Sequence, residues 1–431
     1  MEYFKNNSWI IIRKKMILFI ILDFVLFVSF FSINFDQLIN IKAFCISIFW
    51  IIISYLSGRY HKLTYGDNNY IRYLYNSTKA LIILFFTFKL SSLFLFKIKN
   101  ELYIIFYCFI SSNILFLTRK LINYSTKTKN SWRFIGSKDT LEKIKDYDDV
   151  AERNYEIILL KEEELKLNNE LQSKYKNIIY EFNYHKNFDL KQIKKRELNS
   201  LSLIDWHDIY LNRFPPFLVD KGFISSSNEY LKSTSYIIFK RVLDIFLSFS
   251  ILLISSPIIL VICLLVLIED GHNPFYTQLR NGLKGKEIKI VKIRSMKKNA
   301  ENNGAVWSTK EDTRITNIGK IIRKTRIDEL PQLISVIKGD MSLIGPRPER
   351  PEIDKLLSKE IKHYDLRYLI KPGLSGWAQV NYPYGASVKD AEYKLSYDLY
   401  YQYRQNILLD ILIIIKTVKL VLNQEGAVSK N

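Results

Sequence analysis

Five long apolar runs constrain the fold of this chain more than any other feature of its sequence. Four of them lie in the N-terminal part, at about 16–34, 41–57, 78–97 and 101–118. An α-helix of about 20 apolar residues crosses the hydrocarbon core of a bilayer, where its backbone satisfies its own hydrogen bonds. The runs therefore predict four transmembrane helices within residues 1–122 and a mainly α-helical membrane protein with small α/β parts.

Basic residues flank these runs asymmetrically. They precede the first run, follow the second and follow the fourth: Arg13, Lys14, Lys15, Arg59, Lys62, Arg72, Arg119 and Lys120. Basic loops stay in the cytoplasm, so both ends of the bundle are predicted to face it, and only Lys97 and Lys99 oppose this pattern. Asp23 lies in the first run without a charged partner in the other three, so we interpret it as a packing or interfacial residue.

The composition supports a membrane location. Lys and Arg number 63 against 43 Asp and Glu, which gives a net charge of +20, and 48% of the residues are hydrophobic. The basic residues gather at the ends of apolar runs and not on a separate face, which favours an anionic membrane surface over nucleic acid. The cysteines lie inside apolar runs and the histidines are scattered, so no disulfide framework and no zinc or histidine metal site is predicted.

Residues 123–232 are highly charged and predict a small cytoplasmic α/β domain. A strand, a turn and a helix are expected from Trp132 onward, with further short strands at 155–160 and 177–182. The turn carries one glycine, Gly136, where a dinucleotide-binding loop has three. We therefore interpret the domain as a reduced Rossmann-like unit that binds no cofactor. Serine-rich stretches at 225–235 indicate a linker.

The fifth apolar run, at about 245–268, has Ser256 and Pro257 at its centre. Its length allows one more transmembrane span. Proline, however, removes a helix hydrogen bond and kinks the helix. Basic residues also lie on both flanks, Lys240 and Arg241 before the run and a lysine-rich segment after it. Because a crossing would place one basic cluster on the wrong face, we predict a re-entrant helix with its kink at Ser256 and Pro257.

The last region, residues 233–431, carries the charged residues that are candidates for catalysis. A β-hairpin is expected between Phe275 and Arg294, with Asn-Gly and Lys-Gly turns between its strands. Lys292 and Arg294 are two residues apart on its second strand, so both are expected to project from one face. Paired cations on a strand are by themselves typical of a solvated surface.

Asp328 and Glu329 are adjacent carboxylates where a helix is expected to begin. Asp328 suits an N-cap, and Lys338-Gly339 suits the C-terminus of that helix. An isolated acidic pair mostly marks an ordinary capped surface helix. Here Arg347, held between two prolines, adds a guanidinium with little backbone freedom that suits a phosphate. Carboxylates beside fixed cations predict phosphoryl chemistry, in which positioning and charge neutralisation do most of the catalysis.

These motifs resemble the catalytic domain of the bacterial sugar transferases, the monotopic polyprenyl-phosphate glycosyl-1-phosphate transferases that begin surface-polysaccharide assembly. The resemblance covers residues 240–424, and the predicted spans and middle domain match the large form of the family. It rests on these segments: Lys240-Arg241 and Asp244, Ser256-Pro257, Gln278 to Gly285, Lys292 to Met296, Asp312 to Gly319, Asp328 to Leu333, Lys338 to Pro348, and Lys371 to Asn381. Residues 381–387 resemble members that act in exopolysaccharide export.

The resemblance implies transfer of a sugar 1-phosphate from a nucleotide sugar, expected to be a UDP-sugar, to undecaprenyl phosphate with release of UMP. Asp328 would be the nucleophile that forms a covalent phospho-sugar enzyme, with Glu329 assisting beside it. Mg²⁺ would bridge Asp328 and the diphosphate oxygens. The resemblance also implies phosphate or substrate binding by Lys292, Arg294, Arg347, Gln379 and Asn381.

Three segments depart from the family pattern. The loop before Pro274 lacks the usual small Gly/Ser-rich form, the middle domain is shorter, and Tyr382-Pro383 replaces a glycine and an arginine after Asn381. The last change affects a region expected to touch the sugar. The resemblance therefore leaves the sugar open among glucose, galactose and N-acetylated sugars.

The implied location is the bacterial inner membrane, with several spans and a cytoplasmic catalytic domain where nucleotide sugar, lipid phosphate and membrane lipids meet. The oligomeric state stays open. One alternative is a polytopic sugar-phosphate transferase, which needs many more spans with acidic motifs between them. Another is a catalytically inactive membrane scaffold, which has no need of adjacent carboxylates beside fixed arginines. Stretches rich in Tyr, Lys and Arg at 361–371 and 391–404 are expected in the membrane interface or in solvent.

Overall fold

The computed structural model describes most of the chain. The described residues are 14–34, 41–60, 69–94, 101–124, 130–147, 155–159, 177–181, 199–224, 234–298, 300, 312–382, 385 and 387–422. The predicted serine-rich linker falls almost wholly on residues 225–233, outside the described residues. The chain forms two compact units: the N-terminal helices lie in the first, and residues 132–153 and 157–431 form the second.

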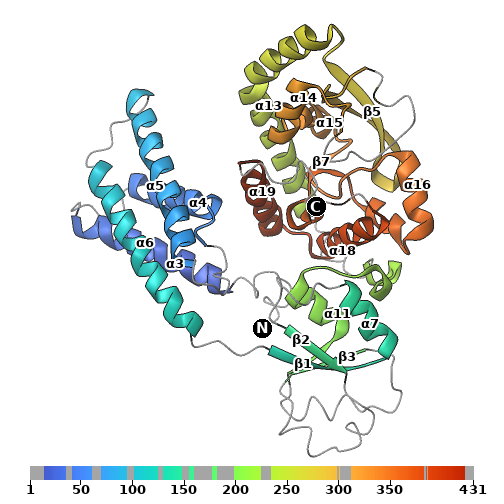
Figure 1. The fold of residues 1–431 in the computed structure, drawn as a ribbon, viewed down its shortest axis with the longest axis horizontal. Helices are drawn as coiled ribbons and strands as arrows, with labels where there is room; N and C mark the ends of the chain where they lie inside the picture. Colours follow the sequence, from blue (N-terminus) through green and yellow to red (C-terminus); the bar gives the residue numbers. More distant parts are fainter. Residues whose placement is uncertain are drawn as a thin grey trace, which may run out of the picture. The chain divides into compact units, whose positions relative to one another are not determined.

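Four described helices form the first unit (Figure 1): α3 (Lys14–Asn34), α4 (Ile41–Leu56), α5 (Asn69–Phe94) and α6 (Glu101–Tyr124). The four predicted apolar runs are therefore helical. Trp50, Ala80, Leu84 and Cys108 form a buried core between α4, α5 and α6. Large apolar side chains also face outward, such as Phe86, which is 66% exposed. Helices that are apolar both inside and outside are typical of a membrane environment.

A buried ion pair within this unit was not evident from the sequence. Arg59, just after α4, donates to Asp23 on α3 through Nη1 at 2.5 Å and Nη2 at 3.2 Å. Asp23 also accepts from the Tyr60 hydroxyl, and Arg59 donates to the Tyr73 hydroxyl on α5. The guanidinium lies 4.9 Å from the centre of the Trp50 ring. This partner of Asp23 was not predicted because Arg59 lies just beyond the end of the second apolar run.

The described strands of the middle region form one sheet in the order β2-β1-β3-β4. They are β1 (Asn130–Ile135), β2 (Tyr155–Leu159), β3 (Asn177–Tyr180) and β4 (Asn199–Ser202), with α7 (Lys138–Tyr147) after β1. The pairs β1–β3 and β3–β4 are parallel. The strands predicted in this region are confirmed, and β4 is an addition to them. The assignment of a Rossmann-like domain stays a prediction.

A carboxylate lies at the position after β1 where Rossmann folds bind phosphate. Glu181, directly after β3, accepts from the Ser137 amide at 3.0 Å and the Thr140 hydroxyl at 2.9 Å, at the N-terminus of α7. Gly136 serves packing, because a Cβ there would lie 2.3 Å from the Phe134 ring. An internal anion thus already satisfies this helix N-terminus, which favours the interpretation that the unit binds no dinucleotide.

Residues 203–224, here called the docking segment, pack on α18 (Val388–Arg404). The segment contains α11 (Leu203–Trp206), the π-helix η2 (His207–Leu211) and the 3₁₀-helix η3 (Pro216–Leu218). Asp208 pairs with the Arg404 guanidinium, with the Nε atom 3.1 Å from Oδ1, and the Phe214 amide donates to the Ser396 carbonyl at 2.9 Å. Residues 395–402 of α18 are buried. The expectation that the stretch 391–404 lies in the interface or in solvent is therefore wrong.

The rest of the second unit surrounds two small sheets (Figure 1). Its remaining elements are α13 (Thr234–Asp270), β5 (Phe275–Asn281), η4 (Leu283–Gly285), β6 (Glu287–Ile293), α14 (Asn317–Thr325), η5 (Ile327–Gln332), α15 (Leu333–Lys338), β7 (Ser342–Ile344), α16 (Pro351–Glu360), η6 (Tyr364–Leu369), β8 (Gly373–Ser375), α17 (Trp377–Asn381) and α19 (Ile407–Leu422). Strands β5 and β6 form the predicted antiparallel hairpin, and β7 and β8 pair in parallel. The stretch 361–371 is largely η6, whose Tyr364, Leu366 and Arg367 are buried, so it is not an interface helix.

Helix α13 continues through Pro257, and within the described residues it is the one helix long and apolar enough to cross a membrane. Pro257 has no N–H to donate to the Leu253 carbonyl. The Ser256 hydroxyl donates to that carbonyl at 2.8 Å, so the freed acceptor is satisfied. Three shorter apolar stretches lie in the first unit, at Met16–Leu26, Ile46–Leu56 and Ile104–Thr118. That the N-terminal helices cross the membrane stays a prediction.

Both ends of α13 are attached to the same unit through helix termini. Near its start, Arg241 donates to the Val336 carbonyl at 2.6 Å and the Ile337 carbonyl at 2.7 Å, at the C-terminus of α15. Near its end, Glu269 accepts from the Asn317 amide at 2.9 Å, at the N-terminus of α14. The cation and the anion each lie at the helix end whose partial charge they complement.

The buried pair of the first unit generates a stability prediction. Arg59→Met leaves Asp23 buried without its cation, so we expect the unit to lose about 3–5 kcal/mol of unfolding free energy. Thermal unfolding of the full-length protein in detergent measures the loss. The double variant Asp23→Leu with Arg59→Met removes both charges and is expected to recover most of it. Equal stability of the single variant and the wild type would contradict a structural role for the pair.

Candidate active site

The two adjacent carboxylates lie on the 3₁₀ turn η5, which joins α14 to α15. Arg326 ends α14 in the left-handed conformation, with φ of 59°, and starts η5. Asp328 is therefore the second residue of a 3₁₀ turn, and the prediction that it is an N-cap is wrong because the turn begins earlier. The predicted C-terminus is confirmed, since Gly339 caps α15 with φ of 98°. Asp328 and Glu329 are both buried, each 8% exposed.

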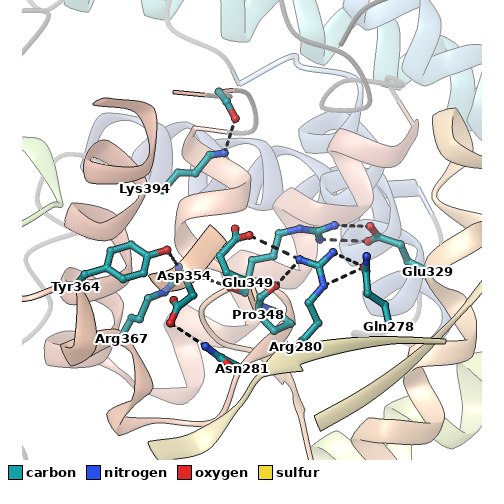
Figure 2. A network of polar contacts seen from close by, with 12 residues as sticks. Gln278, Arg280, Asn281, Glu329, Pro348, Glu349, Asp354, Tyr364, Arg367 and Lys394 are labelled. Carbon is teal, nitrogen blue, oxygen red and sulfur yellow. Dashed lines mark hydrogen bonds and ion pairs between the residues drawn. The ribbon is translucent and has the colours of Figure 1, made fainter. Parts of the chain in front are cut away.

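Glu329, labelled in Figure 2, forms a bidentate ion pair with Arg347. The Arg347 Nη2 atom donates to Oε1 at 2.6 Å and Nη1 donates to Oε2 at 3.4 Å, while Arg326 Nη1 lies 3.5 Å from Oε1. Burial alone would raise the pKa of Glu329, but Arg347, Arg326 and Lys292 more than offset it and hold this pKa below its usual range. Glu329 is therefore ionised and already paired.

Asp328 differs from its neighbour although the two are adjacent. Within the described part of the chain, its Oδ1 atom is buried and has no hydrogen-bond donor. Burial, together with the charge of Glu329, raises the pKa of Asp328 to about 6, against the opposing effect of Lys292, Arg326 and Arg323. An ionisable carboxylate oxygen without a partner is suited to act as a nucleophile or as a metal ligand.

Lys292 comes to the dyad from β6, whose segment packs against η5. Burial lowers the pKa of Lys292 to about 8, and Glu329 and Asp328 work against this lowering. Arg280 lies on the neighbouring strand β5, and burial lowers its pKa to about 10 against the effect of Glu349. Arg280 lies in a segment that carries the family resemblance, but it was not predicted as a site residue. Its signal was available, because Gln278 and Arg280 alternate along β5 on the face that also carries Lys292.

The remaining predicted site residues do not join the dyad among the described contacts. Arg294 Nη1 lies 3.6 Å from Asp270 Oδ2 at the end of α13, so Lys292 and Arg294 do not act as a pair. Gln379 donates to the Leu374 carbonyl at 3.0 Å. Asn381 accepts from Lys416 Nζ at 2.6 Å on α19. Whether substrate reaches Arg294, Gln379 and Asn381 stays a prediction.

The donor set around the dyad fits a magnesium ion that is shared with substrate. Among the described residues, no group of three or more His, Cys, Asp and Glu side chains lies close enough to hold a metal alone. Mg²⁺ usually takes one or two protein carboxylates and completes its shell with substrate phosphates and water. The unpartnered Oδ1 of Asp328 is the atom that such an ion would use.

Comparison with known proteins gives matches over the region that carries this site. The bacterial sugar transferase family matches residues 235–424. A UDP-N-acetylgalactosamine-undecaprenyl-phosphate N-acetylgalactosaminephosphotransferase of Aeromonas hydrophila is 41% identical over 197 residues, which cover 46% of this chain and 47% of that protein. A UDP-glucose:undecaprenyl-phosphate glucose-1-phosphate transferase of Klebsiella pneumoniae is 39% identical over 183 residues, 42% of this chain and 39% of that protein.

A shorter relative is matched over nearly its whole length. An uncharacterized sugar transferase of Bacillus subtilis is 36% identical over 194 residues, which cover 45% of this chain and 92% of that protein. The chain spans about half or less of the Aeromonas and Klebsiella proteins. The similarity to those two therefore concerns part of each chain and not the whole molecules.

The Glu329–Arg347 pair generates a prediction on stability and pH. Arg347→Met is expected to lower the unfolding free energy at pH 7 by about 1–3 kcal/mol, because Glu329 is left buried without its main cation. The loss is smaller than for a fully buried pair, since the Arg347 side chain is 36% exposed. The depressed pKa of Glu329 stabilises the fold above the unfolded value of about 4.3, so the difference from wild type should shrink as the pH falls below that value. Melting temperatures at pH 7 and pH 4 measure it, and a pH-independent difference would contradict the pairing.

Proposed function

The chain belongs to the bacterial sugar transferase family, and we propose that it transfers a sugar 1-phosphate from a UDP-sugar to undecaprenyl phosphate, releasing UMP. The observation that carries this proposal is the unpartnered Oδ1 of Asp328, buried beside the Glu329–Arg347 pair within the region that matches the family. Two relatives are named for different sugars, N-acetylgalactosamine and glucose. The proposal therefore commits to a UDP-sugar and leaves the sugar to experiment.

In the first step, an Asp328 carboxylate oxygen attacks the β-phosphorus that carries the sugar. The bond from that phosphorus to the bridging oxygen breaks, and UMP leaves with the electron pair. In the second step, a phosphate oxygen of the lipid attacks the same phosphorus and the Asp328 carboxylate is released, which leaves a lipid diphosphate sugar. Splitting the transfer in this way needs a nucleophile that is ionised and not held by a hydrogen-bond donor of the protein. Among the described residues, Asp328 Oδ1 meets both conditions above pH 6.

The neighbouring cations supply charge neutralisation. Arg347 and Lys292 lie at the dyad from two different elements, so phosphate oxygens entering the site meet fixed positive charge. Glu329 keeps the Arg347 guanidinium at the site through its 2.6 Å contact. Mg²⁺, held by Asp328 and substrate oxygens, would add Lewis-acid polarisation of the diphosphate.

We further propose that α13 is a re-entrant helix that keeps the catalytic region at the cytoplasmic leaflet of the inner membrane. Its two ends are attached to α15 and α14 of one compact unit, and its middle carries exposed apolar side chains such as Ile254, 77% exposed. A straight span would separate the two attachment points by the thickness of the bilayer, about 30 Å of hydrocarbon. The helices α3 to α6 are proposed as four further membrane helices.

The alternative function is a catalytically inactive membrane scaffold. Such a protein has no use for a buried carboxylate oxygen without a partner, because an unsatisfied buried charge lowers stability and contributes nothing to assembly. The presence of this atom beside fixed cations favours the enzyme.

Asp328→Asn tests the nucleophile. The variant keeps the shape of the side chain but removes its nucleophilic oxyanion, so UMP release from UDP-glucose and from UDP-N-acetylgalactosamine is expected to fall by about 10³-fold or more. The assay uses purified full-length protein with undecaprenyl phosphate, and chelation of Mg²⁺ is expected to stop the wild-type reaction. Asp139→Asn, at an exposed position on α7, is the matched control and should keep full activity. Undiminished turnover by the Asp328 variant would exclude this role.

The topology of α13 is tested by labelling cysteines on either side of it. Asp139→Cys precedes the helix and Lys286→Cys follows it in the hairpin turn, and both positions are exposed. In a chain whose native cysteines are replaced by alanine, a membrane-impermeant maleimide should label neither position in intact cells and both after lysis. Labelling of Lys286→Cys alone in intact cells would mean that α13 crosses the membrane.

A further inference from the structure

The turn that carries Arg347 is held through its carbonyls and not through its amides. Pro346 and Pro348 have no N–H, so the turn lacks two of its own donors. Four successive carbonyls each accept a hydrogen bond from another part of the chain: that of Pro346 from the Gly373 amide at 2.8 Å, of Arg347 from Arg367 Nη2 at 2.7 Å, of Pro348 from Arg280 Nη1 at 3.2 Å, and of Glu349 from the Asn281 amide at 2.9 Å. Every peptide plane of the turn is therefore fixed from outside.

Two of these bonds determine where the Arg347 side chain points. The Pro346 carbonyl lies in the peptide plane before the Arg347 Cα atom, and the Arg347 carbonyl lies in the plane after it. Holding both planes fixes φ and ψ of Arg347 and with them the direction of its Cα–Cβ bond. The plane after Cα depends on Arg367, because its guanidinium is the donor to that carbonyl.

Arg367 is itself buried and constrained on two other sides, and Figure 2 shows one of them, the contact with Tyr364. Its Nη1 atom donates to the Tyr364 hydroxyl, and Nη2 donates to Asp398 Oδ2 at 3.2 Å on α18. The side chains of Arg367 and Asp398 are 6% and 3% exposed. A planar guanidinium reaches three partners in different directions at once, whereas an ammonium is a single point of charge.

We propose that Arg367 is a positioning residue for catalysis: by holding the Arg347 carbonyl it aims the Arg347 guanidinium at Glu329 and at the substrate phosphate. The inference rests on the proposed function, because the aim of Arg347 matters only if a phosphate is bound there. Buried ion pairs also occur as purely structural contacts. A test must therefore measure turnover at the Asp328–Glu329 site as well as the stability of the fold.

Arg367→Lys in the full-length protein provides that test. The lysine keeps the charge beside Asp398 but is expected to lose the bond to the Arg347 carbonyl, so kcat/KM for UMP release should fall by about 10–100-fold. Most of this loss should appear in kcat and little in KM, because a misplaced Arg347 guanidinium no longer stabilises the charge that develops during transfer. Asp398→Asn, which keeps the size of the partner, should lower kcat in the same way by a smaller amount.

Arg404→Lys is the matched control. Arg404, the last residue of α18, also forms a buried ion pair, in this case with Asp208. It has no described contact with the turn that carries Arg347. This variant should lower the melting temperature about as much as Arg367→Lys and leave kcat at the wild-type value. If both variants lose stability and neither lowers kcat, Arg367 is structural only and the inference fails.

A second measurement needs no substrate. In a double-mutant cycle on melting temperature, the losses from Arg367→Lys and Arg347→Met should be sub-additive, because part of the first loss acts through Arg347. Additive losses would overturn the inference even if the wild type transfers no sugar phosphate. An inactive wild type with sub-additive losses would overturn the proposed function and leave the positioning of Arg347 intact.

Discussion

Two adjacent carboxylates on one short turn repel each other, and burial raises the energy of their charged forms further. Pairing of Glu329 with Arg347, at 2.6 Å, relieves one charge and leaves Asp328 with a raised pKa and an unpartnered oxygen. The asymmetry gives the two neighbours different chemistry. Most of the second unit can be understood as support for that pair, since β6 brings Lys292, the prolines restrict Arg347, and η6 holds its carbonyl.

The ends of α13 are likewise held by complementary charges, here between side chains and helix termini. An apolar helix of 37 residues stays close to a charged domain only if its ends are fixed. Arg241 at the C-terminus of α15 and Glu269 at the N-terminus of α14 fix them by complementing opposite helix dipoles. Asp328, the proposed nucleophile, is on η5, which lies between α14 and α15 in sequence. The contacts that hold α13 therefore also hold the two neighbours of that turn.

Prediction from the sequence succeeded where the signal is local. Apolar runs located the helices of the first unit, the Asn-Gly and Lys-Gly turns indicated the hairpin of β5 and β6, and Gly339 marked the end of α15. It failed at Asp328, because a left-handed Arg326 caps the turn two residues before the expected cap, and an arginine seldom signals that conformation. It also failed for the stretch 391–404, whose charged and aromatic composition suggests a surface helix. The docking segment buries that helix, and the composition of a helix does not show whether another segment packs on it.

The sequence by itself determined the apolar runs, the order of the motifs, the acidic dyad and the resemblance that they carry, because these depend on residues close together in the chain. The tertiary structure decided which charges meet. Arg59 and Asp23 are separated by 36 residues, Arg367 and the Arg347 carbonyl by 20, and Arg404 and Asp208 by 196. Arg294 was expected beside Lys292 and instead faces Asp270. Contacts of this kind result from packing of whole elements, and only the folded chain brings such distant side chains within a few ångströms.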